Sequence, residues 1–481
     1  MKKYKYELIV LLSSISIMIL ELTATRILSP YVGTSNIVWT SIIGIILASM
    51  AIGYYLGGIL ADKKPKTNIL GLIILISAIY ISLIPLLEVT LINKISLNIE
   101  SLKISSILCS IILFMIPSIL LAMVYPFCMK LKEITQQTVG LIAGKLSFFS
   151  TIGSIIGTFT TGFWLLPLLG NRMILMVLSL SLIIISFLII KKNIKLILLI
   201  TICILVSLTS FYFSKNIYKT NNPNVLLDKD TEYSRAIVAK LDDDSRELVI
   251  GNRRQSLSND NLSQINYYNY FDLMDELNPE LENVLLIGGG GYSYPKNFLE
   301  QHKDKKLDVV EIDPELVEIA KEYFNYEENP NITNYFQDGR TFLNQNEKKY
   351  DVILLDAYEG VTPPFQLVTV EALKKVKESL TENGVVIANI MGATEGEKSL
   401  LLKAEYLTYN EVFDKVLFLT NYEHNQTVRT NIFIAFKNYD ESRINYDNVL
   451  FDNIIDDFEV EEDLPILTDD YAPVEYYTSK Y

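Results

Sequence analysis

Three acidic residues in the second half of the chain follow short apolar runs and are the side chains best suited to chemistry: Glu311, Asp338 and Asp356. A carboxylate at the end of a buried strand can accept hydrogen bonds from the two hydroxyls of a ribose, which is the role we expect for Glu311. Asp338 is placed to accept a hydrogen bond from an exocyclic amine such as that of adenine. Asp356 follows Val-Ile-Leu-Leu and would lie at the centre of the pocket, where a carboxylate can take a proton from a nucleophile.

Four consecutive glycines begin at Gly288, directly after the apolar run at 284–287. A strand, a glycine-rich turn and a helix in this order let a backbone approach a nucleotide without interference from side chains. A glycine cluster alone is as often a flexible loop, but Glu311 follows at the spacing, about 20 residues, at which Rossmann-like folds hold the ribose hydroxyls. We therefore expect Gly288, Gly289 and Gly290 to bind the cofactor.

Each acidic residue has a simpler interpretation as a helix cap or a solvated loop residue, and for Asp313 that interpretation is preferred. Taken together, however, the glycine run, the pair Asp338-Gly339 and the segment from Asp356 to Glu359 fall at the ends of successive predicted strands. In a parallel sheet the carboxyl ends of the strands form the ligand site. Their joint occurrence favours a nucleotide site over a set of unrelated caps, and we expect Gly339 to belong to it.

Strands and helices alternate from residue 284 onward, which predicts a mostly parallel sheet with helices on both faces. The strands are expected at 284–287, 307–310, 332–336, 352–355, 385–390, 415–420 and 431–436, and the main helices at 294–302, 314–324 and 369–380. A small β subdomain is expected before this sheet, because 234–240 and 247–251 alternate like a hairpin and a tyrosine-rich stretch follows them.

Charge divides the chain into two halves. Residues 1–214 hold 16 basic and 6 acidic residues, a net charge of +10. Since the whole chain has a net charge of −14, residues 215–481 carry a net charge of −24. A basic, apolar half joined to an acidic half indicates a membrane domain followed by a soluble domain. The acidity argues against a nucleic-acid partner and allows a cationic substrate, although it is equally consistent with a role in solubility alone.

The first half contains about seven apolar segments of the length that a bilayer requires. The first includes Glu21 and Arg26 and is expected to be retained rather than cleaved as a signal peptide. The others lie near 37–61, 68–88, 104–128, 146–169, 172–190 and 195–214. We therefore expect a transmembrane domain at 1–214, a linker at 215–229, the β subdomain at 230–275 and a Rossmann-like domain at 276–481.

Lysines indicate the orientation of these helices. They gather before the first helix, after the second, after the fourth and between the last two, which places the N-terminus in the cytoplasm. Seven helices would then place the soluble domain outside, whereas an adenosyl cofactor is made inside. We resolve this conflict in favour of a multi-pass protein of the cell membrane whose catalytic domain is cytoplasmic.

Two membrane segments carry small residues four apart, Gly53 with Gly57 and Gly153 with Gly157. Such pairs let helix backbones approach closely. Packing within the bundle is the preferred interpretation, and a homodimer interface is the alternative. Glu21 and Arg26 are candidates for function inside the membrane, although pairing with each other or with a neighbouring helix is the simpler explanation.

A metal site is not expected. The three cysteines all lie in apolar runs without the spacing of a zinc site, and the chain has only two histidines.

The series IGGGG, VVEIDPE, QDGRTFL and YDVILLDAYEG resembles spermidine synthase and other aminopropyltransferases in order and spacing. The hairpin and tyrosines resemble the small N-terminal β domain of that family. The first half, including ELTATRILSPYVGTSNIVW, resembles the membrane domain of fused transporter-like and spermidine-synthase-like proteins of bacteria and archaea, and LTDDYAP resembles their closing segment. The resemblance covers nearly the whole chain and implies a spermidine-synthase or methyltransferase type of Rossmann-like fold.

The resemblance implies a role for each acidic residue. Glu311 matches the acid that binds the ribose, Asp338 the acid that binds adenine, and Asp356 the aspartate that takes a proton from the attacking amine. The family motif Asp-Ser-Ser-Asp-Pro reads Asp356-Ala-Tyr-Glu-Gly here. Glu359 therefore takes the place of the second aspartate, which anchors the acceptor amine.

One position departs from the family pattern. The soluble enzymes have Gly-Gly-Gly-Asp-Gly, whose aspartate holds the amino group of decarboxylated S-adenosylmethionine, whereas that position is Gly291 here and Tyr292 follows. The nucleoside site is thus expected to be intact, and the site for the aminopropyl amine is in question. We expect Tyr268 and Tyr292 to contact the substrate.

These features predict an enzyme that transfers a group from an S-adenosylmethionine-type donor to an amine. The preferred reaction is transfer of an aminopropyl group from decarboxylated S-adenosylmethionine to a putrescine-like amine. The first alternative is a methyltransferase that uses S-adenosylmethionine on a membrane-associated substrate, which the missing carboxylate favours. The second is a transporter or sensor that binds an adenosyl ligand or polyamine without catalysis.

Overall fold

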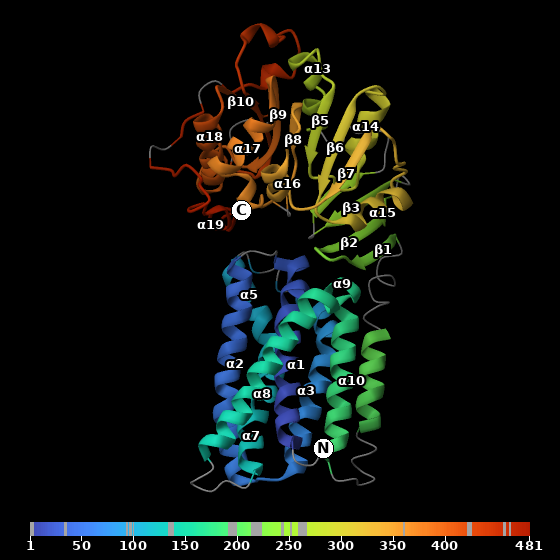
Figure 1. The fold of residues 1–481 in the computed structure, drawn as a ribbon, viewed down its shortest axis with the longest axis vertical. Coiled ribbons are helices and arrows are strands. Elements are labelled where there is room, and N and C mark those ends of the chain that lie inside the picture. Colours follow the sequence, from blue (N-terminus) through green and yellow to red (C-terminus); the bar gives the residue numbers. More distant parts are fainter. Residues whose placement is uncertain are drawn as a thin grey trace. The chain divides into compact units, whose positions relative to one another are not determined.

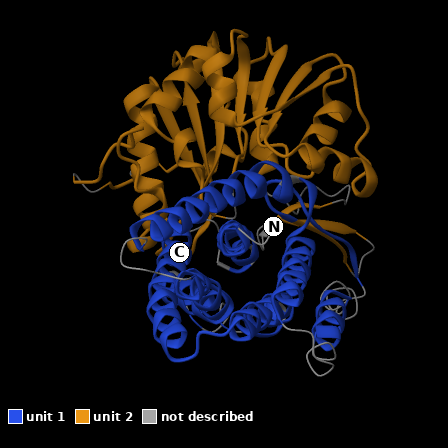
Figure 2. Cartoon of the chain, turned by 60° about the horizontal axis from the view of Figure 1, so that its bottom comes forward, with its two compact units in different colours: residues 1–235 blue, residues 236–481 orange. Residues whose placement is uncertain are grey.

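The computed structural model of the chain divides into two units, residues 1–235 and 236–481 (Figure 2). It describes every residue except 1–3, 33–35, 93–94, 96–98, 100, 133–138, 191–199, 213–223, 242–244, 251–252, 258–266, 359–360, 421–425, 456–457 and 461–462.

The first unit is a bundle of long apolar helices (Figure 1). Within its described residues, six helical stretches are long and apolar enough to cross a membrane: Lys5–Ser29, Asn36–Lys63, Thr67–Leu87, Lys103–Leu131, Val139–Leu165 and Asn171–Ile189. They are formed by α1 (Lys5–Val32), α2 (Asn36–Lys63), α3 (Thr67–Leu87), α5 (Leu102–Ser110), α6 (Ile116–Ala122), α7 (Val124–Leu131), α8 (Val139–Thr160) and α10 (Asn171–Ile189), together with π-helical turns at Ile111–Met115 and Thr161–Leu165. The short helix α9 (Leu166–Leu168) follows the fifth stretch. The prediction of a polytopic helical domain agrees with this arrangement.

The seventh predicted segment, 195–214, is described only in part. Its described portion is a shorter apolar helix, Ile200–Tyr212, and the rest lies outside the described residues. At about 1.5 Å per residue such a helix covers about 20 Å, less than the roughly 30 Å of a hydrocarbon core. A count of seven crossings therefore stays a prediction.

The small residues four apart lie where helices of the bundle touch. A Cβ atom at Gly53 would lie 2.4 Å from the carbonyl oxygen of Ile119, and one at Gly153 would lie 2.4 Å from that of Leu11. Side chains at these positions would force the helix pairs apart. Packing within the bundle, the preferred interpretation of these motifs, is confirmed.

Arg26 donates a hydrogen bond to the carbonyl of Thr231, 2.6 Å away.

A four-stranded sheet in the order β1-β2-β3-β4 takes the place of the predicted hairpin. Its strands are β1 (Val225–Asp230), β2 (Arg235–Lys240), β3 (Arg246–Ile250) and β4 (Arg253–Leu257). The predicted strands at 234–240 and 247–251 correspond to β2 and β3. The last residues of the predicted linker, 225–229, belong to β1, because they begin with the apolar run Val-Leu-Leu and pair in the sheet.

A seven-stranded sheet in the order β10-β11-β9-β8-β5-β6-β7 forms the core of the second unit. Its strands are β5 (Asn283–Ile287), β6 (Lys306–Glu311), β7 (Ile332–Phe336), β8 (Tyr350–Leu355), β9 (Leu380–Gly392), β10 (Lys415–Leu419) and β11 (Arg429–Phe436). The five strands from β7 to β9 are parallel, and β11 and β10 join antiparallel at one edge. The predicted Rossmann-like α/β fold is confirmed, with all seven strands in place.

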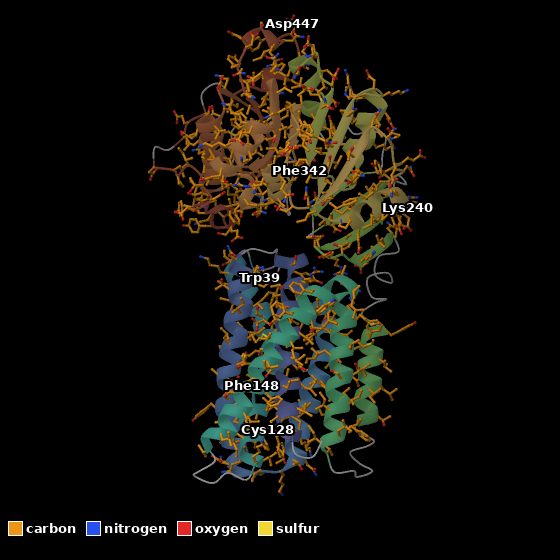
Figure 3. The ribbon with its side chains drawn as sticks, in the orientation of Figure 1. Trp39, Cys128, Phe148, Lys240, Phe342 and Asp447 are labelled. Carbon is orange, nitrogen blue, oxygen red and sulfur yellow. The ribbon has the colours of Figure 1, made fainter. Side chains whose placement is uncertain are left out.

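Helices connect these strands and cover the sheet (Figure 1). They are α12 (Tyr268–Phe271), α13 (Met274–Leu277), α14 (Ser293–Gln301), α15 (Pro314–Tyr323), α16 (Gly339–Gln345), α17 (Val370–Ser379), α18 (Leu400–Val412) and α19 (Val474–Thr478). Phe342 of α16, labelled in Figure 3, is buried against the sheet together with Leu285 and Ile353.

The chain reverses its direction of progress across the sheet at β5. It runs outward from β5 to β6 and β7, and then returns to the other side of β5 with β8. The carboxyl ends of β5 and β8 therefore border a topological switch point, the place where open α/β sheets bind their ligands. Gly288 and Asp356 stand at these two ends.

Candidate active site

Gly288 lets the ends of β5 and β8 touch. Its φ angle is +105°, a conformation that residues with a side chain rarely adopt. A Cβ atom at this position would lie 2.3 Å from the carbonyl oxygen of Asp356. The ends of the two strands are also joined directly, because Asp356 N donates to the Ile287 carbonyl at 2.9 Å. A glycine is therefore required here to place Asp356 beside the glycine turn.

The Asp356 carboxylate is held by two neutral donors. Tyr267 donates its hydroxyl to Oδ2 at 2.8 Å, and Asn389 donates Nδ2–H to Oδ1 at 2.8 Å. Burial raises the pKa of Asp356 to about 6, and the hydrogen bonds from Asn389 and Tyr267 oppose that shift. A carboxylate with a pKa in this range is mostly ionised at neutral pH yet basic enough to take a proton.

The aromatic cluster around Tyr267 includes the predicted substrate residue Tyr268. The two rings are 4.7 Å apart between centroids, and Tyr268 also packs against Tyr294 at 5.2 Å. Burial and the nearby Asp356 raise the pKa of both Tyr267 and Tyr268 well above the usual range for tyrosine. Both phenols therefore stay protonated, and Tyr267 remains a hydrogen-bond donor to Asp356.

Glu311 is turned toward the glycine turn. Its Oε2 accepts hydrogen bonds from the backbone N–H of Gly289 (2.9 Å) and Gly290 (3.0 Å), and its Oε1 accepts one from Asp313 N (3.0 Å). Burial raises the pKa of Glu311, and the three backbone N–H groups counteract it. A carboxylate has about four acceptor positions, so roughly one remains for a ribose hydroxyl. The structure brings Glu311 and the glycines together, and binding of the ribose stays a prediction.

Asp338 and Gly339 begin α16 beside the end of β5. Asp338 caps the helix by accepting a hydrogen bond from Thr341 N at 2.9 Å, and its second oxygen accepts one from Gln366 Nε2 at 3.3 Å. A Cβ atom at Gly339 would lie 2.8 Å from Cγ2 of Ile287, so a glycine is needed for this approach. The capping interpretation thus holds for Asp338 as a structural role, and adenine binding by the same carboxylate stays a prediction.

Asp313 is a helix cap, which is the interpretation that the sequence favoured. It precedes Pro314 and accepts a hydrogen bond from Glu315 N at 3.0 Å at the start of α15. Its side chain is buried.

Gly291 occupies the position at which the soluble enzymes have an aspartate, and Ser256 of β4 fills the adjacent space. A Cβ atom at Gly291 would lie 2.5 Å from Cβ and 2.6 Å from Oγ of Ser256. Gly291 N donates to that hydroxyl at 2.9 Å. No side chain fits at this position unless Ser256 moves, which explains the absence of a carboxylate in physical terms.

Tyr292, the second predicted substrate residue, points into the core beneath the glycine turn. Its hydroxyl donates to Asn334 Oδ1 at 3.2 Å, and its ring lies 4.7 Å from that of Tyr326. The side chain is only 1% exposed. The structure therefore places it on the β7 side of the turn and not beside Asp356. Glu359, the predicted anchor of the acceptor, lies outside the described residues.

Three residues of the site were not predicted from the sequence: Tyr267, Asn389 and Ser256. Asn389 lies at the carboxyl end of the strand predicted at 385–390, so the strand-end reasoning that found Asp356 would have found it as well. Tyr267 lies within the tyrosine-rich stretch. Ser256 had no signal, because its contact with Gly291 joins a strand of the small sheet to the turn that follows β5.

Residues 272–426 match the family model of the spermine/spermidine synthase domain. A polyamine aminopropyltransferase of Vibrio vulnificus (strain CMCP6) is 36% identical over 139 residues, which cover 28% of this chain and 45% of the relative. One of Alkaliphilus metalliredigens (strain QYMF) is 34% identical over 115 residues, which cover 23% and 40%. The solved spermidine synthase of Thermotoga maritima is 19% identical with a TM-score of 0.40, over 51% of this chain and 82% of that one.

The chain spans less than half the length of the curated relatives it matches. The predicted resemblance to the aminopropyltransferases is confirmed for this segment of the second unit.

Proposed function

We propose that the chain is a membrane-bound transferase that moves an aminopropyl group from decarboxylated S-adenosylmethionine to a putrescine-like amine. The observation that carries this proposal is the Asp356 carboxylate, held by two neutral donors at the switch point of the sheet. The relatives named polyamine aminopropyltransferase, which the second unit resembles, support the choice of reaction.

In the proposed reaction Asp356 acts as the base. The neutral amine attacks the methylene carbon beside the sulfonium, a C–N bond forms, and the C–S bond breaks to leave methylthioadenosine. The extra proton on the new ammonium nitrogen passes to Asp356. The protein supplies position and a base, while the sulfonium supplies the leaving group. Gly288 to Gly290, Glu311 and the pair Asp338-Gly339 would hold the nucleoside.

A methyltransferase that uses S-adenosylmethionine is the second candidate, because Gly291 offers no carboxylate for the donor amino group and Ser256 leaves no space for one. The same nucleoside pocket would serve both donors. The difference lies in which carbon beside the sulfonium the acceptor reaches.

One experiment separates these reactions. The purified full-length protein in detergent is incubated with each donor and putrescine, and the products are identified by mass. Methylthioadenosine and spermidine support aminopropyl transfer, whereas S-adenosylhomocysteine and a methylated product support the second candidate. Binding of a donor without any product would favour a sensor or transporter. The Asp356→Asn variant is the control for background reaction.

We place the catalytic unit on the cytoplasmic side of the membrane, because the donor is made there. The six long apolar helices support a membrane-spanning first unit by length and composition.

A further inference from the structure

Asp469, in the segment LTDDYAP, forms an ion pair with Arg340, the residue that follows the pair Asp338-Gly339. Nη2 of Arg340 donates to Oδ2 of Asp469 at 2.8 Å, and Nη1 donates to Oδ1 at 3.4 Å. Asp469 lies beyond residue 426, where the match to the family model ends. The proposed reaction does not use this contact, so its role has to be argued from what it holds.

The guanidinium of Arg340 also holds the turn before α17. Its Nη1 donates to the carbonyl of Gln366 at 3.2 Å and to Oγ1 of Thr369 at 3.3 Å. The Thr369 hydroxyl in turn donates to Oδ1 of Asp469 at 2.7 Å. Because a guanidinium is a rigid, planar set of donors, these contacts fix residues 366–369 relative to the first turn of α16.

Asp469 is itself held in place through its backbone. Its N–H donates to Oε2 of Glu371 at 2.9 Å. Two residues earlier, Leu467 is fully buried, and its carbonyl accepts from Val370 N at 2.8 Å while its N–H donates to Oγ1 of Thr408 at 3.0 Å. The segment is thus attached to α17 and α18, and it presents the Asp469 carboxylate to Arg340 in a defined position.

These contacts reach Asp338 through Gln366. The side chain of Gln366, whose carbonyl accepts from Arg340, donates Nε2–H to Oδ2 of Asp338 at 3.3 Å. Oδ1 of Asp338 accepts from the N–H of Thr341 at 2.9 Å and from its hydroxyl at 3.2 Å. A carboxylate oxygen can accept two hydrogen bonds, so within the described part of the chain Oδ2 keeps one acceptor position for a ligand.

We propose that Arg340 and Asp469 are positioning residues of the nucleoside site, which hold Gln366 so that Asp338 directs its open acceptor position toward the exocyclic amine of adenine. This inference rests on the proposed function, in which Asp338 binds adenine. Stability alone gives the pair little purpose, because the Asp469 side chain is 46% exposed and ion pairs as exposed as this contribute little to folding.

The test compares the binding of adenosine with that of purine riboside, which has a hydrogen atom in place of the exocyclic amine. Both are titrated calorimetrically into the full-length protein in detergent. The variants are Asp469→Asn, which removes the charge, and Arg340→Lys, whose ammonium cannot span Asp469 and the Gln366 carbonyl as a planar guanidinium does. The matched control is Asp414→Asn, because Asp414 is 49% exposed and pairs with Lys377 of α17. Thermal unfolding checks that each variant is folded.

The parent and Asp414→Asn are expected to bind adenosine roughly tenfold or more tightly than purine riboside, since the amine donates to a charged acceptor. In Asp469→Asn and Arg340→Lys this ratio should fall to about threefold or less, while the affinity for purine riboside stays within about twofold of the parent. A purely structural role would not produce this result, because it would weaken both nucleosides alike.

An unchanged ratio in both folded variants, or an equal loss of affinity for the two nucleosides, would overturn the role of the ion pair and leave the proposed function standing. A parent that binds the two nucleosides equally would remove Asp338 from adenine binding, and the inference with it. A parent that binds neither nucleoside would overturn the proposed function as well.

Discussion

The hydroxyl of Tyr267 donates a 2.8 Å hydrogen bond to Oδ2 of Asp356, so the base of the proposed reaction is held by a residue from outside the strand that carries it. This bond favours the ionised carboxylate, whereas burial disfavours it. The balance between the two sets the pKa of Asp356 at about 6. The strength of the base therefore depends on Tyr267.

Tyr267→Phe should raise the pKa of Asp356. The variant loses a donor to the carboxylate and keeps the ring, so burial is opposed by Asn389 alone. A hydrogen bond to a charged group contributes about 1.5–3 kcal/mol, which corresponds to a shift of about 1–2 pH units. Since the active form is the carboxylate, the acid limb of kcat/KM should move upward from about pH 6. A pH–rate profile measures this limb, and an unchanged or lowered midpoint would show that Tyr267 does not tune the base.

Asp356→Asn should abolish transfer and leave donor binding nearly unchanged. The amide has almost the shape of the carboxylate but cannot take the proton from the amine. General-base catalysis contributes about 10²–10⁴-fold, so turnover should fall by at least that lower factor. Product formation and donor binding are measured on the same preparation. A variant with more than about a tenth of the parent rate would remove Asp356 from the role of base.

Glu311→Ala should weaken the binding of either adenosyl donor. The change removes an acceptor for the ribose and also releases the N–H groups of Gly289 and Gly290 that the carboxylate holds. The loss of charge-assisted hydrogen bonds is expected to cost on the order of 2–3 kcal/mol, or about 30- to 150-fold in Kd. Asp313→Ala is the matched control, because Asp313 caps α15 and its loss should lower stability only. Donor binding by Glu311→Ala as tight as that of the parent would show that the pocket is assigned wrongly.

Gly291 and Ser256 should be coupled in stability. Gly291→Ala introduces a Cβ atom 2.5 Å from that of Ser256, and Ser256→Gly removes the atoms in its way. Each single variant should destabilise the protein, whereas the double variant should be more stable than the sum of the two changes by about 1 kcal/mol or more. Thermal unfolding of the four proteins completes the cycle. Additive effects would mean that the glycine turn can move away from β4.

The sequence predicts the large sheet well because its signal is local. Mostly apolar runs mark four of the five parallel strands, all except β7, and all seven observed strands overlap the predicted ranges. The glycine turn and Glu311 are adjacent for the same reason, since consecutive parallel strands place their ends together. Asp338 caps α16 at the edge of the candidate site, and its binding of adenine stays a prediction.

Contacts between distant segments leave no such local signal. Ser256 of β4 and Gly291 of the glycine turn are joined by a hydrogen bond, and no pattern in either segment indicates this contact. Tyr292 has a φ angle of 58°, and its side chain is buried against Asn334 and Tyr326, two residues that are distant in the sequence. Glu405 reads as an ordinary polar residue on an amphipathic helix, and only the folded structure shows that it is fully buried.

Contacts within the first unit place residues 228–235 at one end of the bundle. The Thr231 carbonyl accepts from Arg26 near the end of α1, and Arg235 lies 3.8 Å from Glu88, which follows α3. The backbone N–H of Asn171, the first residue of α10, donates to Asp230. These three helix ends share one side of the bundle.

The start of α1 lies at the other end. Glu7 pairs with Lys132, which follows α7. Figure 3 shows Cys128 of α7 and Trp39 near the start of α2 toward opposite ends of the bundle. The beginning of the chain and residue 235, after which the second unit starts, are thus on opposite sides of the bundle.

The last prediction therefore concerns both ends of the chain, which should face opposite sides of the membrane. A catalytic unit in the cytoplasm then requires an N-terminus outside, although the lysines near α1, α2 and α7 favour the reverse. Loop charges bias insertion by a limited free energy, whereas an enzyme without its donor performs no reaction at all. We accordingly expect alkaline phosphatase, which is active only outside the cytoplasm, to be inactive when fused after Tyr481 and active when fused before Met1. The reverse pattern would show that the lysines set the orientation and that the proposed donor must be exported, while equal signals from both fusions would contradict the contacts of Thr231 and Arg235.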